Sequence, residues 1–118
     1  MAEKDEQKML VGWCRSNGIR IIHIPNEGQR NPWTGRDLVA MGLERGVSDL
    51  FLPYPRGAYS GLWIEMKHGK NKLTEDQRDW LQFCSGQGYA VYVAYSFEEG
   101  RDAVARYLNL NKGDKHGE

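Results

Sequence analysis

Two short stretches of the 118-residue sequence decide its fold: Gly46-Val47-Ser48-Asp49, and, after a hydrophobic run and a turn, Trp63-Ile64-Glu65-Met66-Lys67. Side chains alternate across a β-strand, so Glu65 and Lys67 project to one face while Ile64 and Met66 project to the other. The pattern predicts two neighbouring strands, at 47–52 and 62–67, joined by a connection rich in Pro and Gly at 53–59. One face of this strand pair can be polar while the other is buried.

The polar side chains on these strands are of the types that metal-dependent phosphodiester hydrolysis requires. Asp49 and Glu65 are the acids expected to converge, because Mg²⁺ takes carboxylate oxygens and keeps several waters. Lys67 is placed to orient the attacking water or to stabilise charge that develops on the phosphate. An acid followed by Glu-x-Lys also occurs by chance on solvated strands, so these three residues alone leave a purely structural role open.

The rest of the chain divides into helices and strands by its apolar periodicity and its Pro and Gly residues. Helices are predicted at 3–15, from Thr34 or Gly35 to Glu44, from Thr74 to the glycines at 86 and 88, and from about 97 to 110, with further strands at 19–24 and 89–95. Thr74-Glu75-Asp76-Gln77 and Ser96-Phe97-Glu98-Glu99 have the pattern of capping boxes. Cys14 and Cys84 lie on apolar helical stripes, which favours buried free thiols over a disulfide or metal ligands.

Composition places the chain among single globular domains, with 40% hydrophobic and 27% charged residues. No apolar run approaches the length of a membrane span and the N-terminus is polar, so a cytoplasmic protein without membrane contact is expected. The formal net charge is zero, but seven basic and four acidic residues give the segment 28–72 a charge of +3. This uneven distribution permits nucleic acid to bind near the predicted site.

Three consecutive motifs carry a resemblance to a known family: Gly46 to Pro53, Gly61 to Lys67, and Leu73 to Leu81. Together they resemble the motifs of the VRR-NUC domain, the virus-type replication-repair nuclease branch of the PD-(D/E)XK superfamily. The loop from Ile24 to Arg30 is similar to that of the stand-alone, phage-type members. The resemblance implies an α/β fold with a restriction-endonuclease-like core, in which a central mixed sheet of about four strands is flanked by helices in the order αβ(α)ββαβα.

The same resemblance implies one nuclease domain over 1–110, followed by a polar tail at 111–118. It implies a Mg²⁺- or Mn²⁺-dependent endonuclease that hydrolyses DNA, selects four-way junctions or other branched DNA, and acts as a homodimer in a bacterial host or phage-infected cell. Two alternatives are a catalytically inactive nucleic-acid-binding module of the same fold and a sequence-specific restriction-type nuclease. The first would have lost an acid or the lysine, and both acids and Lys67 are present. No base-reading extension supports the second.

Two further polar residues have competing interpretations. Gln77 is the reciprocal partner of Thr74 in a capping box, and by resemblance it also faces the metal site and joins Asp49, Glu65 and Lys67 as a catalytic residue. Glu3 suits the first turn of a helix through its negative charge. By resemblance, Glu3 reaches the site as a metal ligand beside Asp49 and Glu65, with Glu6 as the alternative.

Residues expected to contact DNA surround these positions. Arg30, Trp33 and Arg36 are predicted in a loop that grips the backbone, where Trp33 can stack on an unpaired base, although a solvated loop fits equally well. His68, Lys70 and Lys72 follow the catalytic strand and are the best candidates for phosphate contacts. Near the end of the first strand, His23, Asn26 and Glu27 either approach the cleft or lie at the surface.

Overall fold

The computed structural model describes residues 2–25 and 32–116, whose helices and strands follow the predicted order. In sequence they are α1 (Glu3–Ser16), β1 (Ile22–His23), α2 (Pro32–Ala40), β2 (Leu50–Leu52), β3 (Leu62–Met66), α3 (Glu75–Gly86), β4 (Ala90–Ala94) and α4 (Phe97–His116). The strands form one mixed sheet in the order β1-β2-β3-β4. The first two pairings are antiparallel, and β3 and β4 run parallel with α3 as their crossover. The expected mixed sheet flanked by helices is confirmed.

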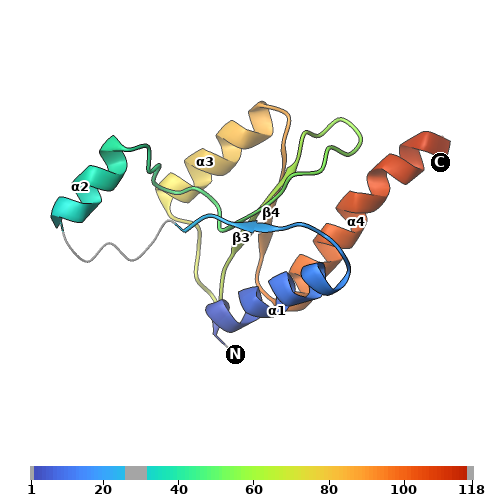
Figure 1. Cartoon of the computed structure of the whole chain (residues 1–118), viewed down its shortest axis with the longest axis horizontal. Helices are drawn as coiled ribbons and strands as arrows, with labels where there is room; N and C mark the ends of the chain where they lie inside the picture. The colour runs from blue at the N-terminus through green and yellow to red at the C-terminus, as the bar shows by residue number, and fades with distance from the viewer. Residues whose placement is uncertain (1, 26–31, 117–118) are drawn as a thin grey trace.

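The helices cover both faces of the sheet (Figure 1). α3 lies on one side, while α1 and α4 pack against each other on the opposite side. The face toward α1 and α4 is largely aliphatic, and its fully buried members include Leu10, Leu50, Ile64, Met66 and Val104. The face toward α3 is aromatic. There Trp63 stacks on Phe51 with ring centroids 4.4 Å apart and meets Trp80 of α3 edge-on at 5.3 Å.

Alternation along β3 explains how one strand serves two different faces. Leu62, Ile64 and Met66 enter the aliphatic core, and Trp63 and Glu65 face α3. Leu62 and the four consecutive residues from Ile64 to Lys67 are nonetheless buried, because both faces of the sheet are covered. Glu65 and Lys67 are therefore not a solvated polar face, and their charges lie inside the protein.

Two predicted strands are shorter than expected. The segment predicted at 19–24 forms a strand only at 22–23, because its first residues close α1: the Ile19 N–H donates to the Cys14 carbonyl at 2.8 Å. The Arg20 N–H is taken by the Tyr54 hydroxyl at 2.8 Å. The strand predicted at 47–52 begins at Leu50, and shortly before it Gly46 passes against the first turn of α3.

The helix boundaries also differ in two places. α2 begins at Pro32 and ends at Ala40, whereas the sequence predicts an end at Gly46. Gly42, with φ of +112°, is the glycine that ends it, and the Leu43 N–H closes the terminus on the Leu38 carbonyl at 2.8 Å. α4 continues to His116, past the predicted end near Leu110, because no proline interrupts residues 111–116.

The two predicted capping boxes have different outcomes. Thr74 and Gln77 form the complete reciprocal box at the start of α3. At the start of α4, the Ser96 hydroxyl accepts the Glu99 N–H at 3.1 Å, but the Glu99 carboxylate accepts the N–H of Tyr95 instead of that of Ser96. The second motif is thus only half a capping box.

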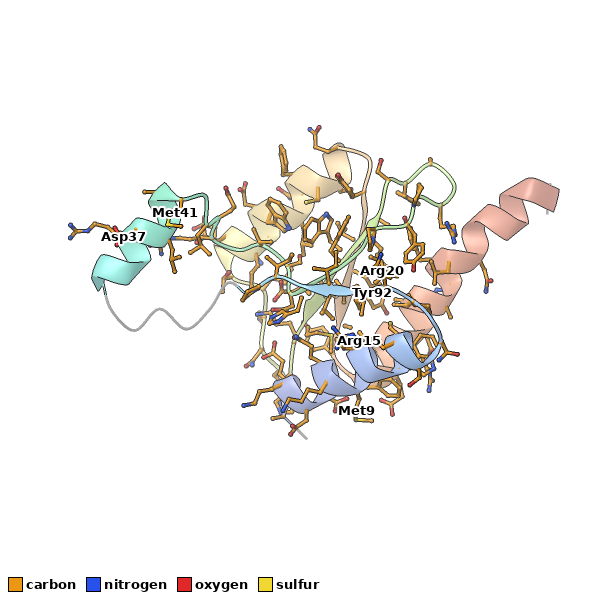
Figure 2. The ribbon with its side chains drawn as sticks, viewed as in Figure 1. Met9, Arg15, Arg20, Asp37, Met41 and Tyr92 are labelled. Carbon is orange, nitrogen blue, oxygen red and sulfur yellow. The ribbon has the colours of Figure 1, made fainter. Side chains whose placement is uncertain are left out.

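α2 stands apart from the sheet, and Figure 2 shows Asp37 on it and Met41 directly after it, away from the other helices. Met41 is 81% exposed. No helix among the described residues is both long and apolar enough to cross a membrane. Cys14 and Cys84 are buried free thiols, as predicted, and burial raises the pKa of each to about 11.

Candidate nuclease site

The two predicted acids meet on neighbouring strands. Asp49 directly precedes β2, and the β2–β3 register pairs Leu50 with Ile64, so the next residues outward along the ladder are Asp49 and Glu65. One oxygen of Asp49, Oδ2, accepts the backbone N–H of Met66 at 2.8 Å. This bond fixes the Asp49 carboxylate against the end of β3. Strand pairing therefore places both acids at one point of the sheet.

Glu65 is buried, with only 3% of its surface exposed. Its Oε2 accepts a hydrogen bond from Gln77, but its Oε1 is buried and has no hydrogen-bond partner among the described residues. A buried carboxylate oxygen without a donor is costly, because the water that would solvate it has been removed. Ser48 Oγ and the indole nitrogens of Trp63 and Trp80 are also buried without a partner among the described residues, but only Glu65 is an acid, for which a bound cation can serve as the partner.

The surroundings of Glu65 raise its pKa from the ordinary 4.5 to about 9. Burial is the largest cause, followed by the negative charge of Asp49 and the proton that the two carboxyl groups can share. The Lys67 ammonium acts in the opposite direction, and Glu3 adds a smaller raising effect. Two acids that repel each other at close range are stabilised as anions when a cation lies between them.

Lys67 is the second buried charge of the site. It is 8% exposed, and its backbone N–H donates to the Ala94 carbonyl at 2.8 Å, which anchors it immediately after β3. Because side chains alternate along the strand, Lys67 faces the same side as Glu65. Its lowering effect on the pKa of Glu65 shows that the ammonium acts on that carboxylate. The pattern Glu-x-Lys thus places an acid and a cation side by side in a dry environment.

Gln77 makes the capping box and also contacts Glu65, while its catalytic role stays a prediction. Its Oε1 accepts the Thr74 N–H at 2.9 Å, and its own N–H donates to the Thr74 hydroxyl at 3.1 Å, which completes the capping box. Its Nε2 donates to Oε2 of Glu65 at 3.2 Å. A side-chain amide has an acceptor end and a donor end, so the cap and the acid each use one end. The start of α3 is thereby tied to the acid on β3.

Glu3 and Glu6 lie one helical turn apart on α1 and make different contacts. The charge of Glu3 acts on Glu65, so the first turn of α1 lies near the acids. Figure 1 shows that turn close to the loop that leaves β3. The Glu6 carboxylate instead accepts the backbone N–H of Phe97 at 2.7 Å, at the beginning of α4. Among the described residues, no group of three His, Cys, Asp or Glu side chains could hold a metal ion, and the role of Glu3 as a metal ligand stays a prediction.

Gly46 is a residue whose role sequence reasoning missed. Its φ is +85°, and a Cβ added to it would lie 2.3 Å from the Asp76 carbonyl oxygen and 2.8 Å from the Gln77 nitrogen. Only glycine allows the chain to pass so close to the first turn of α3. The signal in the sequence was a glycine three residues before the acid, but its partner on α3 cannot be inferred from spacing.

Comparisons with known proteins agree with this geometry. The family model of the VRR-NUC domain matches residues 2–98. The chain belongs to the VRR-NUC family. A solved structure described as a VRR_NUC domain protein superposes with a TM-score of 0.81 at 24% sequence identity, covering 93% of this chain and 90% of the other. No curated protein matches the sequence significantly. The VRR-NUC family has a nuclease-type fold, and the predicted family and fold are confirmed.

The residues that the VRR-NUC resemblance assigns to DNA contact are distributed unevenly. His68, Lys70 and Lys72 are exposed in the connection between β3 and α3, directly after Lys67. Arg36 is exposed on α2, at a distance from the acids along a separate element. Arg30, Asn26 and Glu27 lie outside the described residues, as does the side chain of Trp33. His23 lies in β1 and is exposed. One of the two predicted groups therefore follows the strand that carries Glu65, and the DNA contacts of both groups stay predictions.

Proposed function

We propose that this VRR-NUC domain is a Mg²⁺- or Mn²⁺-dependent endonuclease that hydrolyses DNA phosphodiesters, with a preference for four-way junctions or other branched DNA. The observation that carries the proposal is Glu65, a buried acid with one unpartnered oxygen, held opposite Asp49 and beside Lys67. Most buried carboxylate oxygens that serve only the fold have a donor. The arrangement instead suits a hard cation, which prefers carboxylate oxygens and retains waters.

The two acids would hold the cation, and the rest of its coordination would come from water and substrate. When bound, the cation would polarise the phosphate and lower the pKa of a coordinated water. The Asp49 carboxylate is held in position by the Met66 N–H, and the Glu65 carboxylate by the Gln77 amide. Neither acid has to reorganise when substrate arrives, and such preorganisation is the main source of electrostatic catalysis.

Lys67 contributes a charge that water does not screen. Lys67 is 8% exposed as a whole residue, and its ammonium can donate to the attacking water or to a phosphate oxygen as negative charge accumulates. The exposed His68, Lys70 and Lys72 continue from it toward the surface, where they would bind the flanking phosphates. A single small domain offers one such site. Cleavage of both strands of a branched substrate requires two sites, which a two-fold homodimer would supply.

A cleavage panel tests the proposal. Four-way junctions, flaps, nicked duplexes and linear duplexes of matched length are incubated with Mg²⁺, Mn²⁺, Ca²⁺ or chelator. We expect cleavage of the branched substrates with Mg²⁺ or Mn²⁺, and none with chelator. Equal cleavage of all substrates would contradict the preference for branches, and cleavage in chelator would contradict the metal requirement.

Lys67→Ala and Lys67→Arg refine the test. Removing the ammonium leaves both acids in place, so DNA and Mg²⁺ should still bind while the single-turnover rate falls by about 10²-fold or more. Arginine should rescue poorly, because a planar guanidinium does not fit the buried position of a compact ammonium. Lys72→Ala, an exposed lysine in the same connection, is the control and should weaken binding more than the rate. An unchanged rate in Lys67→Ala at saturating protein would make Lys67 a phosphate-binding residue only.

A further inference from the structure

The last strand of the sheet has a sequence that reads the same in both directions. Residues 89–95 are Tyr-Ala-Val-Tyr-Val-Ala-Tyr, centred on Tyr92. β4 is an edge strand, because the sheet order ends with it. Exposed edges are usually protected by charged residues, proline or a bulge, since they pair readily with another strand. This segment has no charge and no proline.

The hydrogen bonds of β4 show which backbone groups face outward. The Ala90 N–H donates to the Gly61 carbonyl at 2.9 Å, and the Ala94 carbonyl accepts the Lys67 N–H at 2.8 Å, so the even-numbered residues bond to β3. Val91 and Val93 must then point their N–H and C=O groups away from the sheet. At the two ends, the Tyr89 N–H is bonded to the Cys84 carbonyl and the Tyr95 N–H to Glu99. Pairing along the outer edge is therefore open at Val91 and Val93.

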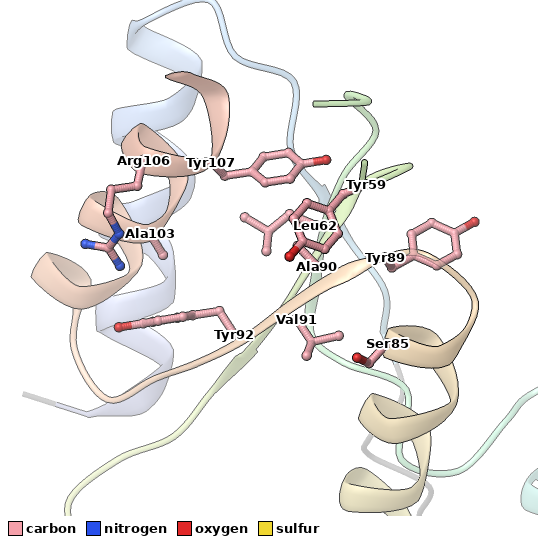
Figure 3. A pocket seen from close by; sticks show the side chains of 10 residues that line it. All are labelled: Tyr59, Leu62, Ser85, Tyr89, Ala90, Val91, Tyr92, Ala103, Arg106 and Tyr107. Atoms are coloured by element: carbon pink, nitrogen blue, oxygen red, sulfur yellow. The ribbon is translucent and has the colours of Figure 1, made fainter. Parts of the chain in front are cut away.

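No helix in the described part of the chain closes this edge. A groove of about 380 Å³ runs along it and is lined from both faces of the strand, by Ser85 of α3 and by Ala103, Arg106 and Tyr107 of α4. Figure 3 shows Tyr92 directed toward Arg106, and Val91 directed toward Ser85. Val91, Tyr92 and Val93 are each only half-buried. A partner strand can reach the edge between the two helices.

We infer that the outer edge of β4 pairs with β4 of a second copy of this chain, antiparallel and centred on Tyr92. In that register Val91 lies opposite Val93 of the second copy, and each pair exchanges two hydrogen bonds, which uses all the outward groups of both residues. Ala90 lies opposite Ala94, and Tyr92 lies opposite itself in a close, non-hydrogen-bonded pair. Because the segment is a palindrome, each residue lies opposite a residue of its own type, so the cross-strand pairs are matched in size, and the two-fold axis relates the two halves of the interface.

The inference rests on the homodimer in the proposed function and specifies its surface. An antiparallel pair within one sheet has its two-fold axis perpendicular to the sheet, so both copies keep α3 on the same face. Glu65 and Gln77 lie on that face, and the two β3 strands run in opposite directions. The dimer would present two sites on one side, with opposite polarity, which matches the opposite polarity of two DNA strands.

The first test measures mass in solution for the full chain. We expect the wild-type protein to sediment as a dimer and Tyr92→Lys to sediment as a monomer, because two ammonium groups would face each other across the axis. Met9→Lys, a substitution at a 41% exposed position on α1, should remain dimeric. A dimer that persists in Tyr92→Lys would overturn the β4 interface. A wild-type protein that stays monomeric at all concentrations would overturn both the interface and the homodimer. The proposed nuclease activity would still be tested separately by the cleavage panel.

The second test fixes the register and does not depend on the folding of a charged variant. Cα atoms in a directly opposed, non-hydrogen-bonded pair lie about 4.5 Å apart, within the range of a disulfide. Tyr92→Cys should therefore form a covalent dimer on mild oxidation. Val93→Cys should not, since its counterpart would be displaced by two residues, to a Cα distance of about 8 Å. The wild-type protein is the negative control and should not cross-link, because Cys14 and Cys84 are buried. Cross-linking of Val93→Cys in preference to Tyr92→Cys would overturn the proposed register.

Discussion

At the scale of single residues, Glu65 is where the proposed function conflicts with stability. Its carboxyl group is buried beside Asp49, and one oxygen has no donor among the described residues. A carboxylate that served only the fold would be placed where it is fully hydrogen-bonded. Active sites tolerate such local costs because the ligand removes them.

Replacing Glu65 with glutamine should stabilise the metal-free protein. The wild-type pKa is raised from 4.5 to about 9, so the native state holds a proton that the unfolded chain releases. That contribution to stability is present below pH 4.5 and is lost as the pH rises through about 9. In chelator at pH 8, Glu65→Gln should raise the free energy of unfolding by about 1–3 kcal/mol, the usual range for relieving a poorly solvated buried polar group.

Urea denaturation in chelator between pH 5 and pH 9 measures this effect. The alkaline loss of stability should be weaker in Glu65→Gln than in wild type, while Glu44→Gln, at an exposed position outside the helices, should follow wild type. Cleavage by Glu65→Gln should be abolished with Mg²⁺. A variant that is less stable than wild type at pH 8 would show that the Glu65 carboxylate is not under strain.

Gln77 allows the cap of α3 to be separated from the acid it contacts. Gln77→Glu keeps an oxygen for the Thr74 N–H but replaces the Nε2 donor with an oxygen that faces Glu65. Cleavage should fall by about 10–100-fold, the usual effect of losing a partner of a ligand side chain. Thr74→Ala removes the hydroxyl cap and should cost about 1 kcal/mol of stability with little effect on the rate. Equal losses of rate in the two variants would make Gln77 a structural residue only.

The sequence predicted the placement of these side chains well because placement on a strand or at a helix start follows from local rules. Alternation placed Glu65 and Lys67 on one face, and the capping-box pattern identified Thr74 and Gln77. Spacing could not reveal that the Gln77 amide serves the cap and the acid at the same time, because that depends on how close α3 lies to β3. It also could not separate Glu3 from Glu6, since the Phe97 N–H that binds Glu6 lies far along the chain.

At the scale of elements, the approach of α3 to the strand that carries Asp49 depends on Gly46. The chain passes the first turn of α3 there with a φ of +85° and no room for a Cβ. Gly18 offers a matched control, because its φ is +71° but nothing lies within 4 Å of an added Cβ. The two glycines share the conformational requirement and differ in their surroundings.

Alanine at each position should separate these two effects. Gly18→Ala should cost about 1–2 kcal/mol, the penalty for a left-handed conformation with a side chain. Gly46→Ala should cost a further 1–3 kcal/mol or so, because α3 must shift, and should slow cleavage as Gln77 moves relative to Glu65. Thermal unfolding and single-turnover cleavage measure both. Equal destabilisation by the two substitutions would show that the contact with Asp76 is not tight.

Element boundaries were predicted less well than element order. The order of elements follows from the apolar periodicity and from the Pro and Gly residues between elements, and both are signals in the local sequence. β1 is short because Ile19 and Arg20 bond to α1 and to the Tyr54 hydroxyl, and α2 ends early because Gly42 closes it before Gly46. Each of these outcomes was decided by a competing partner that the local pattern does not contain.

At the scale of the whole molecule, the two cysteines report on the two sides of the sheet. Cys14 is in the aliphatic core with α4, whereas Cys84 is on α3, and both are free and buried. Burial raises the pKa of each thiol to about 11, so in the native state both are protonated and inert. Either thiol can react with an aromatic disulfide reagent only after the part of the protein around it opens.

Labelling of the two thiols therefore tests whether the sheet and its helices unfold as one unit. In a cooperative protein, Cys14 and Cys84 should be modified at the same rate at neutral pH, measured separately in Cys14→Ala and Cys84→Ala after correction for their stabilities. Mg²⁺ at about 100 times its dissociation constant should slow both reactions about a hundredfold, since a ligand of the native state acts on every global opening. Protection of Cys84 alone would mean that α3, with Gln77 on it, opens as a separate unit and that the cation stabilises only the half of the molecule that contacts Glu65.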